Sequence, residues 1–177
     1  LPFCWGEIEE CGKDPLENAR QKALAYYRIC GQPVFSQDSG LYIEGLPKER
    51  QPGVHVRRVN GVNLTDEQMR KYYKKIAAEF GGRCVAQYQN AICLVFSENE
   101  IYEARGGALN WKKFWLMTEE RPQRMEGFPL DAICADYRTG RHFYDGEATM
   151  PEEEGDGVRD FFRNALKQHE MRNKIEK

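Results

Sequence analysis

The stretch "PVFSQDSGLYIEGLP", residues 33–47, decides how the rest of the chain is interpreted. Its two apolar runs are separated by Gln37-Asp38-Ser39-Gly40. Asp, Ser and Gly favour turns, because short polar side chains bond to nearby backbone groups and glycine tolerates positive φ. The four residues therefore predict a turn between two strands. A second interpretation makes Asp38 a catalytic carboxylate, since such groups are held at the ends of rigid strands.

The composition is that of one ordinary globular domain. A chain of 177 residues can bury one hydrophobic core, which predicts a single domain over residues 1–177. With 41% hydrophobic and 31% charged residues it is neither disordered nor embedded in a membrane. A net charge of −2 does not suggest a nucleic-acid polymer as partner, but a local cationic cluster for a small phosphorylated ligand stays open.

The expected location is the cytoplasm, without a membrane partner. No apolar stretch approaches the length of a membrane helix, and no signal peptide opens the chain. Six cysteines at irregular spacings include no C-x-x-C pair, and several sit in apolar runs, so we expect buried reduced thiols. They are Cys4, Cys11, Cys30, Cys84, Cys93 and Cys134.

A first helix is marked in "DPLENARQKALAYYRICG". Asp14 is the expected N-cap, Glu17 completes a capping box, and Gly31 ends the helix. Asn18 and Lys22 are four residues apart, so they project from the same face of this helix.

The rest of the chain alternates strands and helices. In "TDEQMRKYYKKIAAEFGG", Thr65 and Gln68 repeat the capping-box spacing, which predicts a second helix. Residues 83–105 are expected to form a β-hairpin, and a last helix begins near Gly157. This order predicts an α/β domain with a mixed twisted sheet and flanking helices.

Three motifs in order carry a resemblance. "ENARQKA", "DSGLYIEGLP" and "QPGVHVRR" follow the patterns E-N-A-x-x-K-A, D-D-S-G-L and P-G-V-x-x-x-R, so the chain resembles the inosine triphosphate pyrophosphatase family. The resemblance is strong over residues 8–58. It implies a central nucleotide cleft, Mg²⁺, a homodimer, and hydrolysis of inosine or xanthosine triphosphates and their deoxy forms to the monophosphate and pyrophosphate.

The resemblance also implies roles at the phosphate end of the nucleotide. Lys22 matches the lysine that faces the phosphates, and Asp38 matches a general base that also contacts the metal. Ser39 matches a phosphate-contacting serine, and Glu10 an acidic metal ligand. These residue types suit the chemistry, because carboxylates bind Mg²⁺, cations bind phosphate oxygens, and a base activates water.

Other matches concern the rest of the nucleotide. Arg58 matches the arginine that follows P-G-V, Phe128 and Asp131 fall on the base-recognition segment, and Arg159 stands for the arginine of S-H-R. Simpler interpretations remain beside these. The alternative for Arg58 is an exposed basic pair with Arg57, and the alternative for Asp131 is the end of a strand.

The departures from the family pattern define two alternative functions. Gln37 replaces the first aspartate of D-D-S-G-L, and no stretch matches the family's T-G-N-x-x-K phosphate loop. One alternative is therefore a catalytically weak or inactive nucleotide-binding dimer, with "LPFCWGEIEE" beside a sheet edge at residues 33–36. The altered "GFPLD" segment favours the other, a related hydrolase with a different base preference.

Overall fold

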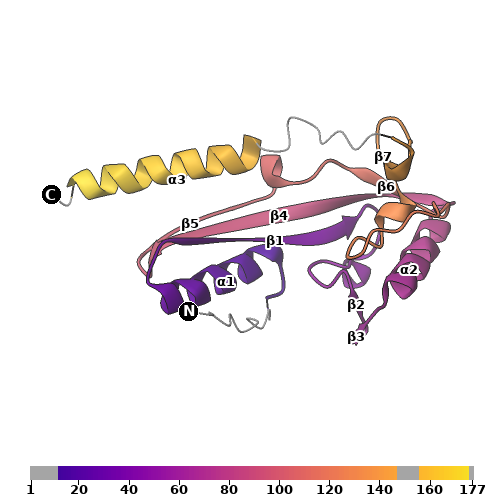
Figure 1. Cartoon of the computed structure of the whole chain (residues 1–177), viewed down its shortest axis with the longest axis horizontal. Coiled ribbons are helices and arrows are strands. Elements are labelled where there is room, and N and C mark those ends of the chain that lie inside the picture. The colour runs from indigo at the N-terminus through magenta and orange to yellow at the C-terminus, as the bar shows by residue number, and fades with distance from the viewer. Residues whose placement is uncertain (1–11, 147–155, 176–177) are drawn as a thin grey trace. The chain divides into compact units, whose positions relative to one another are not determined.

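The computed structural model describes residues 12–146 and 156–175 (Figure 1). The chain forms two compact units, which we describe separately. Unit 1 comprises the described residues of 12–39, 90–109 and 156–175, and unit 2 those of 40–89 and 110–146. That the chain folds as a single domain stays a prediction. Within the described ranges no helix has both the length and the apolar character needed to cross a membrane.

The helices and strands follow one another along the chain as follows. They are α1 (Pro15–Cys30), β1 (Val34–Ile43), η1 (Lys48–Arg50), β2 (Arg58–Val59), β3 (Val62–Asn63), α2 (Asp66–Glu79), β4 (Arg83–Ser97), β5 (Glu100–Arg105), η2 (Gly107–Leu109), β6 (Phe114–Met117), η3 (Asp131–Ile133), β7 (Cys134–Asp136), η4 (Phe143–Asp145) and α3 (Asp156–Ile175).

The main sheet has the strand order β1-β4-β6-β7, and β5 also pairs with β4. The pairs β4–β5, β4–β6 and β6–β7 are antiparallel, and β2 and β3 form a separate antiparallel pair. The predicted hairpin over residues 83–105 is confirmed as β4 and β5. The predicted α/β class, a twisted sheet flanked by helices, is confirmed as well, whereas the nucleotide cleft stays a prediction.

Strand β1 corrects the first expectation from the sequence. It is one continuous strand of ten residues, so the predicted turn at Gln37-Asp38-Ser39-Gly40 is wrong. Gly40 does not form a turn and has a different role in the strand. A Cβ atom at this position would lie 3.0 Å from the carbonyl carbon of Gly53, whose backbone bridges to Leu41. The glycine allows this close backbone approach, and the strand continues through it.

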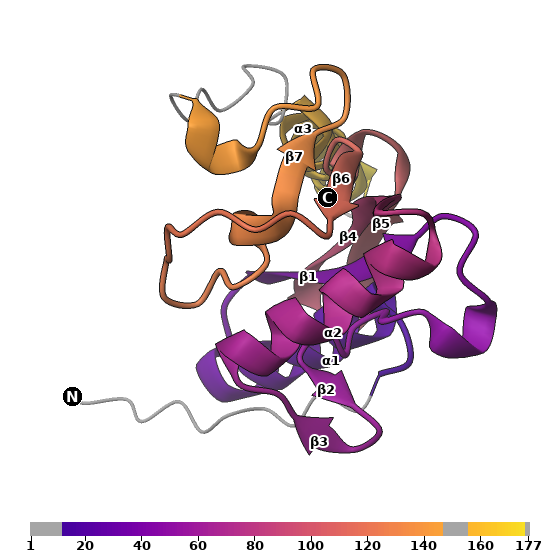
Figure 2. The ribbon, with the colours of Figure 1, turned by 90° about the vertical axis from the view of Figure 1, so that its right-hand side faces the viewer.

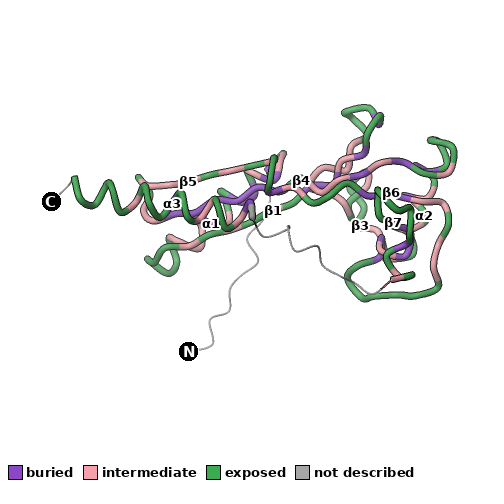
Figure 3. The backbone as a smooth tube through the Cα atoms, turned by 90° about the horizontal axis from the view of Figure 1, so that it is seen from above, coloured by how far each residue is buried: buried purple, intermediate pink, exposed green. Residues whose placement is uncertain are grey.

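In unit 1, α1 and α3 cover opposite faces of the sheet. Ala19 and Ala23 of α1 pack with Cys93 and Val95 of β4. On β1, Phe35 meets Phe162 of α3 edge to face, with ring centroids 5.1 Å apart. Because side chains alternate along a strand, Phe35 and the α1-facing Asp38 point in opposite directions. The segment 90–95 is buried at every position, as Figure 3 shows along β4.

The caps of α1 largely follow the sequence. The Asp14 carboxylate accepts from the backbone N–H groups of Leu16 and Glu17, and Gly31 ends the helix in the left-handed region at φ 63°. The predicted capping box is different in detail, since Glu17 accepts from the N–H of Lys13 at 2.8 Å, one residue before the N-cap. Glu17 is therefore a structural residue.

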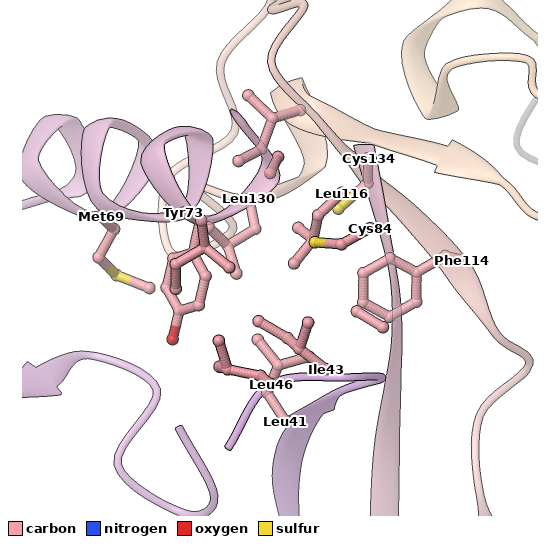
Figure 4. Packing of buried hydrophobic residues seen from close by; sticks show 14 residues of the cluster. Leu41, Ile43, Leu46, Met69, Tyr73, Cys84, Phe114, Leu116, Leu130 and Cys134 are labelled. Carbon is pink, nitrogen blue, oxygen red and sulfur yellow. The ribbon is translucent and has the colours of Figure 1, made fainter. Parts of the chain in front are cut away.

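In unit 2, α2 packs on the sheet (Figure 2). The side chains that it buries there are mainly apolar. Its Met69 and Tyr73 lie in a cluster with Leu41 and Leu116 (Figure 4). Ile76 belongs to the same cluster. Tyr73 is fully buried, and its hydroxyl donates to the carbonyl oxygen of Val56 at 2.9 Å. Such a bond is needed, because a buried hydroxyl without a partner is costly.

The cysteines agree only in part with the expectation of burial. Cys84, Cys93 and Cys134 are buried free thiols, and burial raises the pKa of Cys84 to about 11 and that of Cys93 to about 12. Cys30 is exposed at the end of α1, so the expectation is wrong there. Cys4 and Cys11 lie outside the described residues.

The predicted cap of α2 is confirmed and gives a test of stability. Thr65 accepts from the N–H of Gln68, whose side chain accepts from the N–H of Thr65. We expect Thr65→Ala to lower the free energy of unfolding by about 1 kcal/mol, because it removes one acceptor from the helix N-terminus. Thr65→Ser keeps the hydroxyl and should stay close to wild type. Urea unfolding measures both, and equal losses in the two variants would contradict the capping role.

Candidate functional site

The centre of the candidate site is Asp38, in the middle of β1. Its Oδ1 accepts from Nζ of Lys22 at 2.9 Å, and its Oδ2 accepts from Nδ2 of Asn18 at 3.1 Å. The predicted common face of Asn18 and Lys22 on α1 is thereby confirmed. The side chains of Lys22 and Asp38 are 18% and 13% exposed, so the pair is sheltered but still reaches solvent.

Asn18 holds this arrangement in place. It is 1% exposed, and its Oδ1 accepts from the backbone N–H of Gly12 at 2.8 Å. Its amide therefore fixes the chain before α1 with one end and the Asp38 carboxylate with the other. A Cβ atom on residue 12 would lie 2.4 Å from this oxygen, so only glycine fits there. We did not predict Asn18 as a site residue, although its spacing from Lys22 was the signal.

Ser39 lies on the other face of β1. Its Oγ donates to Oδ1 of Asn90 at 2.8 Å, and Nδ2 of Asn90 donates to the carbonyl oxygen of Leu109 at 2.6 Å. The structure thus brings Lys22 and Asp38 together, but it does not place Ser39 beside them. Asn90 is 3% exposed, and a buried asparagine in an apolar strand was the signal for this second polar pair.

In unit 2, Arg58 begins β2 and Arg57 directly precedes it, but the two side chains have different surroundings. Arg57 donates to the carbonyl oxygen of Leu64 at 3.0 Å and pairs with Asp66 at 2.7 Å. Arg58 is exposed, and its guanidinium has no hydrogen bond or ion pair with any other residue in 12–146 or 156–175. Arg57 is therefore a structural residue, whereas Arg58 remains available to a ligand.

The predicted base-recognition segment presents one ring and one carboxylate. Phe128 is 57% exposed, while Leu130 is 5% exposed and anchors the segment in the core of unit 2. Asp131 begins η3 and is half-buried, and burial raises the pKa of its carboxyl group. Its side chain makes no hydrogen bond within the described part of the chain. A carboxylate that is desolvated without a partner is a candidate binding group.

Two further polar side chains in the described part of unit 2 lack hydrogen-bond partners, although Nε2 of His142 lies 3.7 Å from Oε2 of Glu119. The hydroxyl of Tyr144 and both ring nitrogens of His142 are buried and make no hydrogen bond to the described residues. Burial, followed by the charge of Asp131, raises the pKa of Tyr144. Buried polar atoms in folded proteins normally make hydrogen bonds. The surroundings of Tyr144 and His142 are therefore a place where polar ligand atoms or water would supply the missing hydrogen bonds. No sequence pattern pointed to either residue.

The remaining predicted residues are Arg159 and Glu10. Arg159 is exposed in the first turns of α3, in unit 1. Glu10 lies outside the described residues, so its role as a metal ligand stays a prediction.

The donor set around Asp38 is compatible with Mg²⁺. Within the described ranges no group of three or more His, Cys, Asp or Glu side chains could hold a metal. Mg²⁺, however, is usually bound by only one or two carboxylates together with water and substrate phosphates. Each oxygen of Asp38 accepts one hydrogen bond here and has a further lone pair. Asp38 therefore fits as one carboxylate ligand.

Lysine and arginine side chains, such as Lys22 and Arg58, are the usual partners of phosphate oxygens. A model of the Ham1 family matches residues 3–110. The chain belongs to the Ham1 family, which confirms the resemblance inferred from the three motifs.

Individual relatives agree with this assignment. The dITP/XTP pyrophosphatase of Brucella melitensis is 31% identical over 160 residues, which are 84% of this chain and 66% of that protein. The dITP/XTP pyrophosphatase of Malacoplasma penetrans is 33% identical over 103 residues, 57% of this chain and 50% of that protein. The chain thus spans about half the length of the Malacoplasma relative.

Solved structures show the same fold. A HAM1 protein from Coxiella burnetii superposes with a TM-score of 0.67 at 25% identity, covering 93% of this chain and 81% of that one. The Ham1 protein of Staphylococcus aureus superposes with a TM-score of 0.58 at 24% identity, covering 97% and 82%.

The raised pKa of Asp131 predicts a stability that depends on pH. A carboxyl whose pKa is higher in the folded than in the unfolded state destabilises the fold once it is ionised. We expect Asp131→Asn to be more stable than wild type at pH 7. The difference should shrink as the pH falls through the folded pKa and vanish below the unfolded value of about 3.9.

Thermal unfolding between acid and neutral pH measures this difference. Glu126→Gln, at an exposed position of the same loop, is the matched control and should show no such trend. If Asp131→Asn is less stable than wild type at every pH, the carboxylate has a structural role instead.

Proposed function

We propose that this protein hydrolyses noncanonical purine nucleoside triphosphates, namely ITP, dITP and XTP, to the monophosphate and pyrophosphate. The observation that carries the proposal is the Lys22–Asp38 pair, which lies inside the region matched to the Ham1 family. The names of the Brucella and Malacoplasma relatives support the same substrate class. The protein would then be an enzyme of nucleotide-pool house-cleaning.

Lys22 and Asp38 have complementary tasks in this proposal. An ammonium group has three N–H donors, so Lys22 can donate to Asp38 and to a phosphate oxygen at the same time. Asp38 is the general base, which takes a proton from the attacking water and must lie within hydrogen-bond reach of it. The hydrogen bond from buried Asn18 keeps the carboxylate in one orientation. Such positioning removes much of the entropic part of the barrier.

Mg²⁺ is the proposed cofactor, with Asp38 and Glu10 as its carboxylate ligands. When bound, the ion neutralises charge on the phosphate oxygens and orients the triphosphate. Supporting this assignment is the single sheltered carboxylate of Asp38, which is the usual protein contribution to a magnesium–phosphate site.

The other predicted residues are proposed as substrate contacts. Phe128 offers an exposed ring for stacking on the purine, and Asp131 a desolvated carboxylate for its polar edge. Arg58 is proposed to contact the nucleotide because its guanidinium lacks a partner in the described ranges. Ser39 is proposed as a phosphate contact and Arg159 as a further substrate contact, both on the resemblance of their motifs alone.

The cellular setting is also a proposal. We infer a homodimer from the family and a cytoplasmic location from the composition. The net charge of −2 and the absence of a membrane-spanning helix from the described residues are compatible with that location.

The role of Asp38 is tested by Asp38→Asn. The substitution is isosteric and keeps one of the two hydrogen bonds, so the protein should still fold, which thermal unfolding checks. Loss of the base should lower the rate of pyrophosphate release from ITP with Mg²⁺ by roughly 10²-fold or more. Asp160→Asn, at an exposed position of α3, is the matched control. Turnover by Asp38→Asn at the wild-type rate would remove Asp38 from the reaction.

The substrate class is tested by a panel of triphosphates. We expect ITP, dITP and XTP to be hydrolysed in preference to ATP. Polar groups that pair with a 6-keto purine are left unpaired by the amino group, and such discrimination reaches about 10⁴. The measurement is kcat/KM from pyrophosphate release. Equal values for ITP and ATP would favour a hydrolase of different base preference, and no release from any triphosphate would favour the inactive nucleotide-binding alternative.

A further inference from the structure

A groove of about 640 Å³ lies along α2 in unit 2, and none of the predicted site residues lines it. Its walls come from α2 and from the segment that follows β6. The lining residues are Glu67, Arg70, Lys71, Lys74, Lys75, Ala78, Thr118, Glu120 and Arg124.

The groove is strongly positive. Its lining contains five cationic side chains and two carboxylates, an excess of three positive charges in a chain whose net charge is −2. Sites for apolar ligands are lined mainly by hydrophobic and aromatic side chains. Here only Ala78 and Thr118 are uncharged, so the groove suits a hydrophilic anion.

Glu120 organises the floor of the groove. Its carboxylate pairs with Arg70 at 2.9 Å, with Lys74 at 2.9 Å and with Arg124 at 2.6 Å, and its side chain is 23% exposed. Burial alone would raise the pKa of Glu120, but Lys74, Arg124 and Arg70 lower it. One carboxylate thus holds three cations in fixed positions, and it cannot neutralise all of them.

Lys71 and Lys75 add two more cations at the rim. Both are exposed, and neither has a side-chain hydrogen bond or ion pair with another residue in the described ranges. They are four residues apart on α2, a spacing at which like charges destabilise a helix. Among residues 12–146 and 156–175 no carboxylate forms an ion pair with either lysine, which is the pattern expected when an external anion offsets the repulsion.

We propose that this groove binds a compact polyphosphate anion, either free or as part of a nucleotide. Arginine forks and lysine ammonium groups are the usual partners of phosphate oxygens. The cations on α2 occupy about 7.5 Å of the helix, from Arg70 to Lys75 at roughly 1.5 Å per residue, so they suit a short chain of phosphates. An extended nucleic-acid strand would also meet Glu67 and Glu120. The site does not depend on the proposed catalytic function.

The proposal is tested by measuring how fast the lysines of the groove are acetylated with and without the anion. The full chain is treated with an acetylating reagent while inorganic tripolyphosphate is titrated, and modification of each lysine is followed by mass spectrometry. Tripolyphosphate should protect Lys71, Lys74 and Lys75, while exposed Lys48 and Lys167 stay reactive. This measurement does not depend on turnover, so a failure of the groove proposal can be distinguished from a failure of the proposed enzymatic activity.

Two variants and a control make the result specific. In Lys71→Ala/Lys75→Ala the midpoint of Lys74 protection should move to about tenfold higher tripolyphosphate, roughly the effect of losing one charge-assisted hydrogen bond. Lys48→Ala/Lys167→Ala removes the same charge elsewhere and should leave the midpoint unchanged. Glu120→Gln should move it to lower concentration, because three cations lose their internal partner.

Further ligands separate the sources of the anion. Inosine triphosphate with the same midpoint as tripolyphosphate would assign binding to the phosphates, and a lower midpoint would add a nucleoside contact. The proposal is overturned if orthophosphate at equal ionic strength protects equally well, or if the control double variant shifts as far as Lys71→Ala/Lys75→Ala. Stronger protection by a short single-stranded RNA would also overturn it, in favour of a nucleic-acid surface.

Discussion

The hydrogen bonds from Asn18 and Lys22 to Asp38 are the constraint on which unit 1 depends. A carboxylate in the middle of a strand and largely removed from water is costly unless it is paired and hydrogen-bonded. Both partners come from adjacent turns of α1, so satisfying the carboxylate also fixes the helix against β1. The Ala19 and Ala23 contacts with β4 then complete the packing that the polar pair has aligned. Stability and the proposed chemistry thus use the same three side chains.

Local signals in the sequence predicted the features that local physics controls. The caps at Asp14 and Thr65 and the β4–β5 hairpin depend on residues a few positions apart, so their patterns were sufficient. The common face of Asn18 and Lys22 follows from helix geometry in the same way. The predicted turn at Asp38 is wrong because Gly40 is needed for a close approach to the backbone of Gly53 and not for a turn. No local sequence pattern reveals a contact of this kind.

The candidate site shows the same division between local and long-range information. Family motifs identified Lys22 and Asp38, and the structure brings them together. The surroundings of Tyr144 depend on which segments meet in three dimensions, so they could not be predicted. The difference between Arg57 and Arg58 is similar, because it rests on the pairing of Arg57 with Asp66. For Asn90 the local signal is a polar residue inside an otherwise apolar strand.

The alternation along β1 has a consequence for how this chain can change over evolutionary time. Asp38 and Ser39 occupy opposite faces, each with its own asparagine partner. A one-residue insertion or deletion earlier in the strand would turn a hydroxyl toward Lys22 and a carboxylate toward Asn90. Point substitutions at exposed positions of β1 can accumulate one at a time, whereas a length change would disrupt two polar pairs at once. We therefore expect substitutions to accumulate at exposed positions of this strand while its number of residues stays constant.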